Sequence, residues 1–594
     1  MPPSGALMGS TCIWSWAAFS RAMVTRARCV SAGAARDLAG RMSRAAIIGL
    51  LAVATVSLPR SASPRFYPDD PLWVDDDRAM PVKAVPIEDT NGYDFVVNTF
   101  AQPGERRDVR ALNVNTVDEV PDSSWFTNRI GRKAMSVAEI VRGPDRAESV
   151  DLAGWKVSGG KTTGVQPGFR MTDPQGQTYQ IEIDPPSNPE LASGAEIIGT
   201  AFYHAIGYHV VDVYLAEIDR ESLVIADGAT IRDPLNGRRR SMKKYDLDNV
   251  FNRAARLENG HYRVLVSRFA PGAPLGNFRY YGKRPDDPND LVEHEHRREL
   301  RGARVFGAWL NHDDSRGVNS LDMLETTNGR TWIKHYMFDF GSILGSGTIF
   351  AQRHRSGNEY IFEQKPGWLS MVTLGLYVRP WMTIDYPDVP PSVGRLEADR
   401  FDPLTWKPEY PNPAFANMRP DDAFWAARIV SKFSDEAIRS IVEKARYSDR
   451  AATDFVTKTI IARRNKVVAA WINQVCPVAD VALSADGSLT FTNAAVDAMA
   501  ATPPERYSLN WFRFDNATDQ RTPVGGAMTV SSGSARVPEG LTGDYIGVSV
   551  TATHPQQSGW TTPSTFFFRR ASGGWSLVGV ERGAANTTQT TAGP

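Results

Sequence analysis

A cluster of polar residues in the middle of the chain has the composition of a site for charge-handling chemistry. The stretch WLNHDDSRGVNSL, residues 309–321, places His312, Asp313, Asp314 and Asn319 in one short loop. Carboxylate and amide oxygens are ligands that magnesium takes from proteins, usually beside the phosphates of a substrate. A further carboxylate can accept the proton of an attacking hydroxyl. These residue types therefore favour metal-assisted phosphoryl transfer, which depends mostly on positioning and charge neutralisation.

A β-hairpin after the loop should bring a third oxygen ligand toward it. The segment SLDMLETTNGRTWIKHYMFDFG contains Asn328-Gly329, the dipeptide that most readily adopts the positive φ angles of a type I′ turn. Two strands joined by this turn run antiparallel, so the end of the second strand returns to the start of the first. We therefore expect Asp339 to lie near Asp314 and Asn319.

Other interpretations of the polar residues remain as alternatives. The loop could be an ordinary turn capped by Asp and Asn, and His312 with Asp313 would suit a metal phosphohydrolase if other helices supplied further ligands. GGKT ends like a P-loop, but Trp155 stands where that motif requires glycine. The two histidines of HEHRREL, residues 294–300, are two positions apart. We predict that they lie on a helix surface and bind no zinc.

The loop and the end of the hairpin together resemble the signature of the protein-kinase-like superfamily. HDDSRGVN fits the catalytic-loop pattern H-R-D-x-x-x-x-N, with Asp313 in the place of arginine, and an intact DFG follows at residues 339–341. The resemblance is to atypical exported or bacterial branches, of the HipA, CotH and secretory-pathway kinase types. It implies a two-lobed domain that binds ATP with Mg²⁺ or Mn²⁺ and transfers a phosphoryl or nucleotidyl group.

The resemblance also implies a role for each residue of the loop. Asp314 would be the base that accepts the proton of the acceptor hydroxyl, with His312 and Asp313 completing the catalytic loop. Asn319 and Asp339 would hold the metal ion. The motifs do not identify the acceptor, which could be a protein, a sugar or a lipid.

The phosphate-binding lysine of the superfamily has no direct counterpart. On the expected strand TYQIEID its position is taken by Glu182, and Glu196 on the next helix would be the acidic residue that orients such a lysine. Lys156 and Lys161, in GWKVSGGKTTGVQPG, could supply the cation from a glycine-containing segment. Without such a cation the protein would be a pseudokinase, a non-catalytic binding or scaffold module of the cell envelope.

Hydrophobic periodicity predicts the elements that carry these residues. A hairpin over 167–184 precedes a helix over 188–210, and a helix over 292–310 leads into the polar loop. Three amphipathic helices are expected between 420 and 475. The expected fold class is α+β. It comprises a kinase-like domain at 151–475, with an N-lobe at about 151–275 and a C-lobe at about 290–475, followed by a small C-terminal β-sandwich at 477–582.

The ends of the chain differ from this folded region. Residues 1–63 carry arginines followed by AAIIGLLAVATVSL, a pattern typical of a signal peptide, with an N-terminal membrane anchor as the alternative. Residues 64–150 read as an extended arm pinned by aromatic side chains, and 583–594 as a disordered tail. Only Cys476 lies outside the leader, so no internal disulfide is expected. We expect a periplasmic or secreted protein with no membrane span after processing.

The charge balance argues against a polyanionic partner. Lys plus Arg and Asp plus Glu both total 67, so nucleic acid is not expected to bind. The C-terminal β-sandwich is the place where contact with the cell envelope is expected, although a structural cap is equally consistent with its composition.

Overall fold

Helices and strands follow one another in the α+β pattern that the sequence predicts. The computed structural model describes residues 63–75, 77–81, 83–162, 164–233 and 236–583. Nearly all of the predicted leader and tail therefore lies outside the described residues. The described residues belong to one compact unit.

A seven-stranded sheet carries the glycine-containing segment and Glu182. Its strand order is β4-β7-β3-β2-β1-β5-β6, with β1 and β5 parallel. The bounds are β1 (Lys156–Gly160), β2 (Gly168–Thr172), β3 (Thr178–Glu182), β4 (Val213–Ile218), β5 (Val224–Arg232), β6 (Arg239–Ser241) and β7 (Tyr262–Arg268). The predicted hairpin is present as β2 and β3. Helix α4 (Lys244–Phe251) buries Leu247 and Phe251 against this sheet.

Helix α3 (Leu191–Ile206) connects this sheet with the rest of the protein and is buried on nearly all sides. Asp184, just after β3, accepts hydrogen bonds at 3.1 Å from two backbone N–H groups in the first turn of α3. These bonds satisfy donors that the start of a helix leaves unpaired. The helix ends at Gly207, whose φ is 144° and where a Cβ would lie 2.2 Å from Phe126. Glycine is therefore required at this end.

The hairpin predicted around Asn328-Gly329 is confirmed. β9 (Ser320–Thr327) and β10 (Arg330–Met337) pair in antiparallel register. Asn328 has φ 52° and Gly329 has φ 75°, as a type I′ turn requires. The short strand β8 (Ala273–Pro274) completes this three-stranded sheet.

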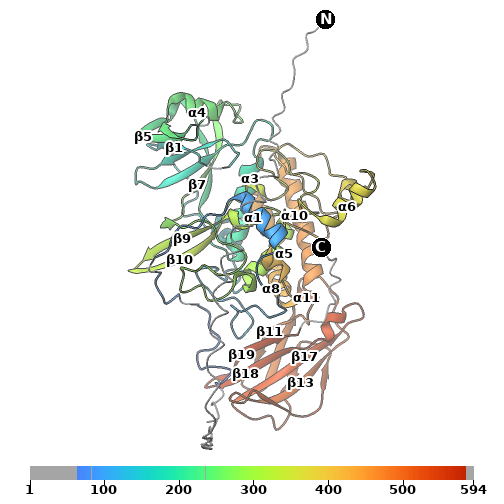
Figure 1. Ribbon diagram of the computed structural model, residues 1–594. Coiled ribbons are helices and arrows are strands. Elements are labelled where there is room, and N and C mark those ends of the chain that lie inside the picture. Colours follow the sequence, from blue (N-terminus) through green and yellow to red (C-terminus); the bar gives the residue numbers. More distant parts are fainter. Residues whose placement is uncertain (1–62, 76, 82, 163, 234–235, 584–594) are drawn as a thin grey trace, which may run out of the picture. The chain divides into compact units, whose positions relative to one another are not determined.

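The helices around the site form a second layer, in which α5, α8 and α10 lie side by side (Figure 1). α5 (Arg298–Leu310) ends at the polar loop, where Asn311 adopts the left-handed conformation. The three helices predicted between 420 and 475 are present as α8 (Pro420–Ser431), α9 (Asp435–Glu443) and α10 (Arg450–Trp471). The shorter helices are α1 (Asn91–Val96), α2 (Val137–Arg142), α6 (Gln364–Val372), α7 (Pro413–Ala416) and α11 (Ala494–Asp497).

The prediction that His294 and His296 lie on a helix surface is wrong. Residues 294–296 form a separate 3-10 helix before α5, and both histidines are buried. A ring nitrogen of His294 lies 2.7 Å from a carboxylate oxygen of Asp290, and His296 Nδ1 lies 2.6 Å from the guanidinium of Arg301. The spacing of the two histidines predicted positions on a helix surface, whereas tertiary contacts pair these residues in the interior.

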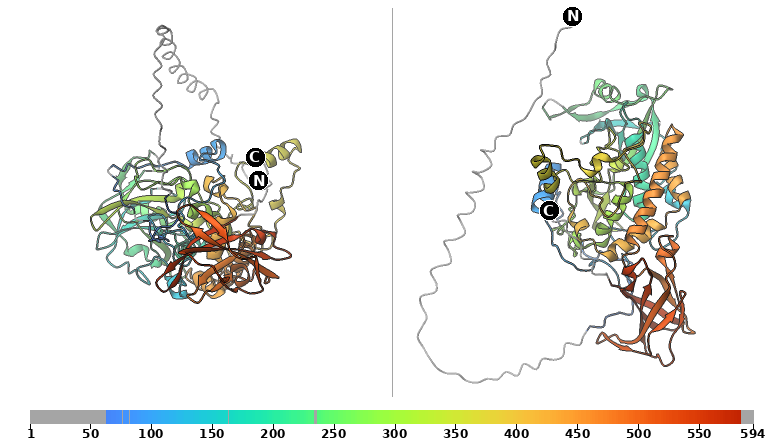
Figure 2. Two further views of the ribbon diagram at one scale, coloured as in Figure 1. Left: turned by 90° about the horizontal axis from the view of Figure 1, so that it is seen from below. Right: turned by 90° about the vertical axis from the view of Figure 1, so that its right-hand side faces the viewer.

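The residues after α10 form two antiparallel sheets, the red strands in Figures 1 and 2. The first sheet has the order β11-β12-β16, and the second runs β14-β13-β17-β18-β19 with β15 beside β13. The bounds are β11 (Val478–Leu483), β12 (Ser488–Asn493), β13 (Arg506–Asp515), β14 (Gln520–Pro523), β15 (Met528–Val530), β16 (Ser534–Arg536), β17 (Tyr545–Thr553), β18 (Ser564–Ala571) and β19 (Gly574–Arg582). Their buried side chains continue the hydrophobic core of the helices, through Trp471 and Cys476.

The arm before residue 150 has few regular elements and is held by buried groups. Trp125 and Phe126 are buried in the main core, as the aromatic residues of the arm predict. Asp118, in the same segment, is nearly inaccessible to solvent. The arm is therefore an integral part of the packed structure.

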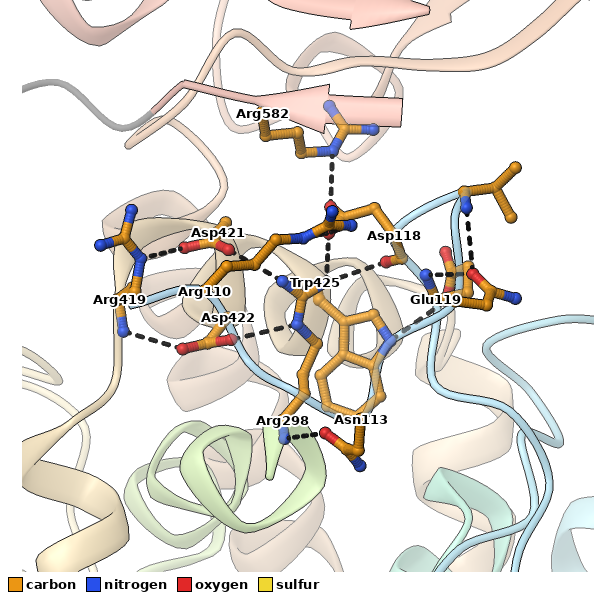
Figure 3. A network of polar contacts seen from close by, with 12 residues as sticks. Arg110, Asn113, Asp118, Glu119, Arg298, Arg419, Asp421, Asp422, Trp425 and Arg582 are labelled. Carbon is orange, nitrogen blue, oxygen red and sulfur yellow. Dashed lines mark hydrogen bonds and ion pairs between the residues drawn. The ribbon is translucent and has the colours of Figure 1, made fainter. Parts of the chain in front are cut away.

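A buried ionic network fixes the start of α5 against the arm (Figure 3). The fully buried Arg298 donates hydrogen bonds to Asp118 at 2.7 Å, to Asp421 at 2.8 Å and to Asp422 at 3.0 Å. Asp118 is shared with two further guanidinium groups, those of Arg110 at 2.7 Å and Arg582 at 3.4 Å. Four chain segments that are distant in sequence thus meet at the base of the helix that carries the polar loop.

Candidate functional site

The polar loop after α5 presents Asp314 and Asn319 as a bonded pair. The amide of Asn319 donates to Asp314 Oδ2 at 2.8 Å, and the Ser342 hydroxyl lies 3.3 Å from the same oxygen. The guanidinium of Arg316 forms an ion pair with Asp314 and a second one with Glu409 at 2.8 Å. The carboxylate of Asp314 is therefore held in place from several sides.

Asp339 follows β10 and returns to this loop, as the hairpin predicts. Its backbone has φ 65° and ψ 53°, a left-handed conformation that aspartate tolerates better than most residues. Its side chain is exposed, and within the described part of the chain its carboxylate has no hydrogen-bond or ion-pair partner. This oxygen pair is free to bind a ligand.

Burial and, to a smaller extent, neighbouring carboxylates raise the pKa of both aspartates. Burial raises the pKa of Asp314 to about 6, with Glu409 adding to the shift and Arg316 opposing it. Asp339 reaches solvent on one side but is otherwise surrounded by protein. This partial loss of water, together with the charges of Asp314 and Glu182, raises its pKa to about 7. Such a concentration of negative charge favours a bound cation.

Lys161 lies beside Glu182, the residue that stands at the expected lysine position. Its ammonium forms an ion pair with the Glu182 carboxylate and donates to the carbonyl oxygen of Gln166 at 3.2 Å. Both charged side chains are largely shielded from solvent. The charge of Lys161 also lowers the pKa of Asp339, which shows that the two groups are near each other. The loop after β1 thus brings a cation to the acidic group.

Lys156 is not brought to this site. It stands at the opposite end of β1, opposite Thr172 in the β1–β2 pairing, and its side chain is exposed. Lys161 is five positions further along the chain, just after the end of β1, which corresponds to roughly 15 Å along an extended strand. Of the two lysines considered from the sequence, Lys161 is the one beside the carboxylates.

Glu196 of α3 faces the residues after Asp339. Burial raises the pKa of Glu196 well above its ordinary range, and the charges of Asp339 and Glu182 add to the shift. The backbone N–H groups of Phe340 and Gly341 oppose it by hydrogen bonding. Among the described residues Glu196 has no lysine partner. Its carboxylate instead accepts hydrogen bonds from the backbone of the DFG segment.

His312 is packed in the interior and does not face the carboxylates. Its Nδ1 lies 2.8 Å from the Tyr203 hydroxyl, and its ring lies 5.7 Å from that of Phe340. Burial lowers the pKa of His312 to about 3, so the imidazole is neutral at physiological pH. Because His312 contacts both Tyr203 and Phe340, it is a positioning residue for the loop.

Asp313 contacts the segment that contains Gln352 and Ser356 and does not bond to Asp314. Its carboxylate accepts hydrogen bonds from the Ser356 hydroxyl and from the amide of Gln352 at 3.2 Å. Burial raises the pKa of Asp313 to about 7. It anchors the segment after the hairpin and does not contact the other site residues.

The donor set suits a metal held jointly with a substrate. Among the described residues, no three His, Cys, Asp or Glu side chains converge on one point. Asp339 and the amide oxygen of Asn319 offer a smaller set, and magnesium commonly takes its other ligands from phosphate and water. The residues present therefore fit a metal ion that takes most of its ligands from a substrate and water.

Three contributors to the site were missed from the sequence. Arg316 lies inside the polar loop at a position that the motif leaves free, so its spacing from Asp314 was the available signal. Ser342 and Glu409 reach Asp314 and Arg316 through the fold. Glu409 lies nearly a hundred residues away, and nothing in its local sequence indicates this contact.

No helix in the described ranges is long and apolar enough to cross a bilayer.

In comparisons with known proteins, no family model and no curated protein sequence matches this chain.

Proposed function

We propose that this protein is an exported kinase-like phosphotransferase, whose domain at 151–475 has two lobes and transfers a phosphoryl or nucleotidyl group from ATP to an acceptor not yet identified. The observation that carries the proposal is the position of Lys161. Its ammonium lies on Glu182 and near Asp339, so a cation enters the acidic site from the loop after β1. An anionic triphosphate can approach carboxylates when cations compensate their charge.

In this proposal the chain's own residues orient the reactants. Asn319 and Asp339 hold the metal ion, Mg²⁺ or Mn²⁺, which when bound neutralises phosphate charge. Lys161 binds a phosphate oxygen by exchanging part of its contact with Glu182. Asp314, fixed by Asn319 and Arg316, accepts the proton of the acceptor hydroxyl. A base with a pKa near 6 suits this role at neutral pH.

The test is calorimetric titration of the purified protein with ATP, with and without Mg²⁺ or Mn²⁺. We expect metal-dependent binding that is lost in Asp339→Ala and weakened about tenfold or more in Lys161→Met, since a charged hydrogen bond is removed. Lys156→Met is the matched control, because the same change is made at an exposed lysine that begins β1, away from the carboxylates. Equal binding by both lysine variants would refute the role of Lys161.

The second candidate is a pseudokinase that serves as a binding or scaffold module. The ion pair between Lys161 and Glu182 favours it, because the carboxylate competes with phosphate for the ammonium. Measurement of the released products separates the two candidates, because phosphoryl transfer releases ADP and nucleotidyl transfer releases pyrophosphate, whereas a scaffold releases neither. If wild type and Asp314→Asn bind ATP equally and neither turns it over, the scaffold is favoured. If no nucleotide binds under any condition, the transferase is excluded.

A further inference from the structure

A cavity of about 480 Å³ lies away from the proposed nucleotide site, between the seven-stranded sheet and the β9–β10 hairpin. Its walls come from the segment before β4, from the residues after β7, and from the distal half of the hairpin. This volume falls within the range of small-molecule sites in proteins. Val210, Phe269, Pro271 and Leu324 give it apolar walls.

Three cationic side chains, Arg146, Arg268 and Lys334, line the cavity together with two carboxylates, Asp212 and Glu325. The cavity therefore has one positive charge in excess. Asp212 lies 3.2 Å from Arg146 and 3.7 Å from Arg268, so one carboxylate positions both guanidinium groups.

Among the described residues, Lys334 is the cation of this cavity that forms no hydrogen bond or ion pair. Glu325 accepts the hydroxyl of Tyr336. The Lys334 ammonium lies 5.3 Å from the centre of the Tyr336 ring, a cation–π contact. Partial burial lowers the pKa of Lys334, while the charge of the nearby Glu325 carboxylate opposes this shift. A partly buried ammonium loses hydration, and an anionic ligand would restore the lost interactions.

We propose that this cavity binds a small organic anion whose oxyanion group contacts Lys334, with Arg146 and Arg268 beside it, and whose apolar part lies against Phe269 and Leu324. The oxyanion is a phosphate monoester or a carboxylate, since both present paired oxygens to guanidinium and ammonium donors. The site does not depend on the proposed phosphotransferase activity, because it shares no residue with the group around Asp314 and Asp339.

The proposal is tested by titration of the intact protein with phenyl phosphate and with benzoate, monitored by calorimetry or saturation-transfer NMR. Benzyl alcohol serves as the neutral probe. We expect at least one anion to bind with a Kd of about 1 mM or lower, and benzyl alcohol to bind more weakly by about tenfold. The stronger of the two anions identifies the ligand class. Failure of both anions to bind would overturn the proposal.

Variants locate the bound probe. Lys334→Gln should weaken anion binding by about tenfold, because one charged donor is lost. Arg146→Gln should weaken it less; that side chain is largely exposed, so the variant is expected to fold. Lys458→Gln, on the outer surface of α10, is the matched control and should bind as wild type does. Binding lost in Lys161→Met but retained in Lys334→Gln would place the probe in the nucleotide site and refute the proposal.

Discussion

Replacing Asp118 by asparagine should destabilise the protein strongly without changing its shape. The side chain is 5% exposed and serves three guanidinium groups, two at 2.7 Å and one at 3.4 Å. Asparagine has nearly the same volume and also tolerates the φ of 66° at this position. The substitution therefore removes charge while keeping packing and backbone conformation.

The magnitude follows from the loss of one partner in a buried ionic network. Arg298 would keep Asp421 and Asp422, but Arg582 would lose its carboxylate partner. Breaking a buried pair costs about 3 to 5 kcal/mol. For a compact unit of this size the unfolding entropy is roughly 1 kcal/mol per kelvin, so the Tm should fall by about 3 to 5 °C.

The assay is urea denaturation followed by tryptophan fluorescence at several pH values. The neighbouring guanidinium groups hold the pKa of Asp118 below its ordinary value, against the effect of burial. Its contribution to stability is therefore complete above the unfolded pKa of about 4 and is lost as the pH falls through the lower folded value. The difference between wild type and variant should be constant from pH 6 to 8 and decrease below about pH 4.

Asp454→Asn is the control, because that carboxylate is 51% exposed and pairs with arginines at the surface. It should change the free energy of unfolding by less than about 1 kcal/mol. If Asp118→Asn were no more destabilising than Asp454→Asn, this network would not hold the arm, α5 and the last strand together.

Two further predictions concern α3. Gly199→Ala would place a Cβ 2.6 Å from Phe340 Cβ and 2.7 Å from Ile343 Cδ1, so it should cost about 1 to 3 kcal/mol and shift Asp339. Calorimetry with ATP and Mg²⁺ should show weaker binding, while Gly367→Ala, with no atom within 4 Å, should behave as wild type. Burial lowers the pKa of His204 to about 3, so protonation opposes folding and stability is lost as the pH falls below about 6.5. When the pH falls from 7.5 to 5, the free energy of unfolding of His204→Gln should rise by roughly 2 kcal/mol relative to that of wild type, as measured by urea denaturation. A difference between the two proteins that stays constant with pH would contradict this.

Local patterns predicted the elements that carry the site. Asn328-Gly329 predicted the hairpin, and the structure confirms it with positive φ at both residues. The helical periodicity after residue 420 predicted α8, α9 and α10. These features are determined by neighbouring residues, because turn conformation and amphipathic spacing act over a few positions. The strands β5 and β6 lack such signals and were not anticipated.

The partners of each site residue were decided by tertiary structure. The sequence offered Lys156 and Lys161 as equivalent cations, and the direction of β1 placed only the second beside Glu182. Likewise, Asp313 and Asp314 are adjacent, yet one bonds Ser356 and the other Asn319.

The sequence by itself determined that an acidic loop, a hairpin and a DFG segment would meet, since one turn connects them. It could not determine which charges would be paired. Arg316 with Glu409, and Arg298 with Asp118, join positions separated by about a hundred residues or more. Such pairs form because burial makes an unpaired charge costly, and which partner is within reach depends on how the whole chain packs.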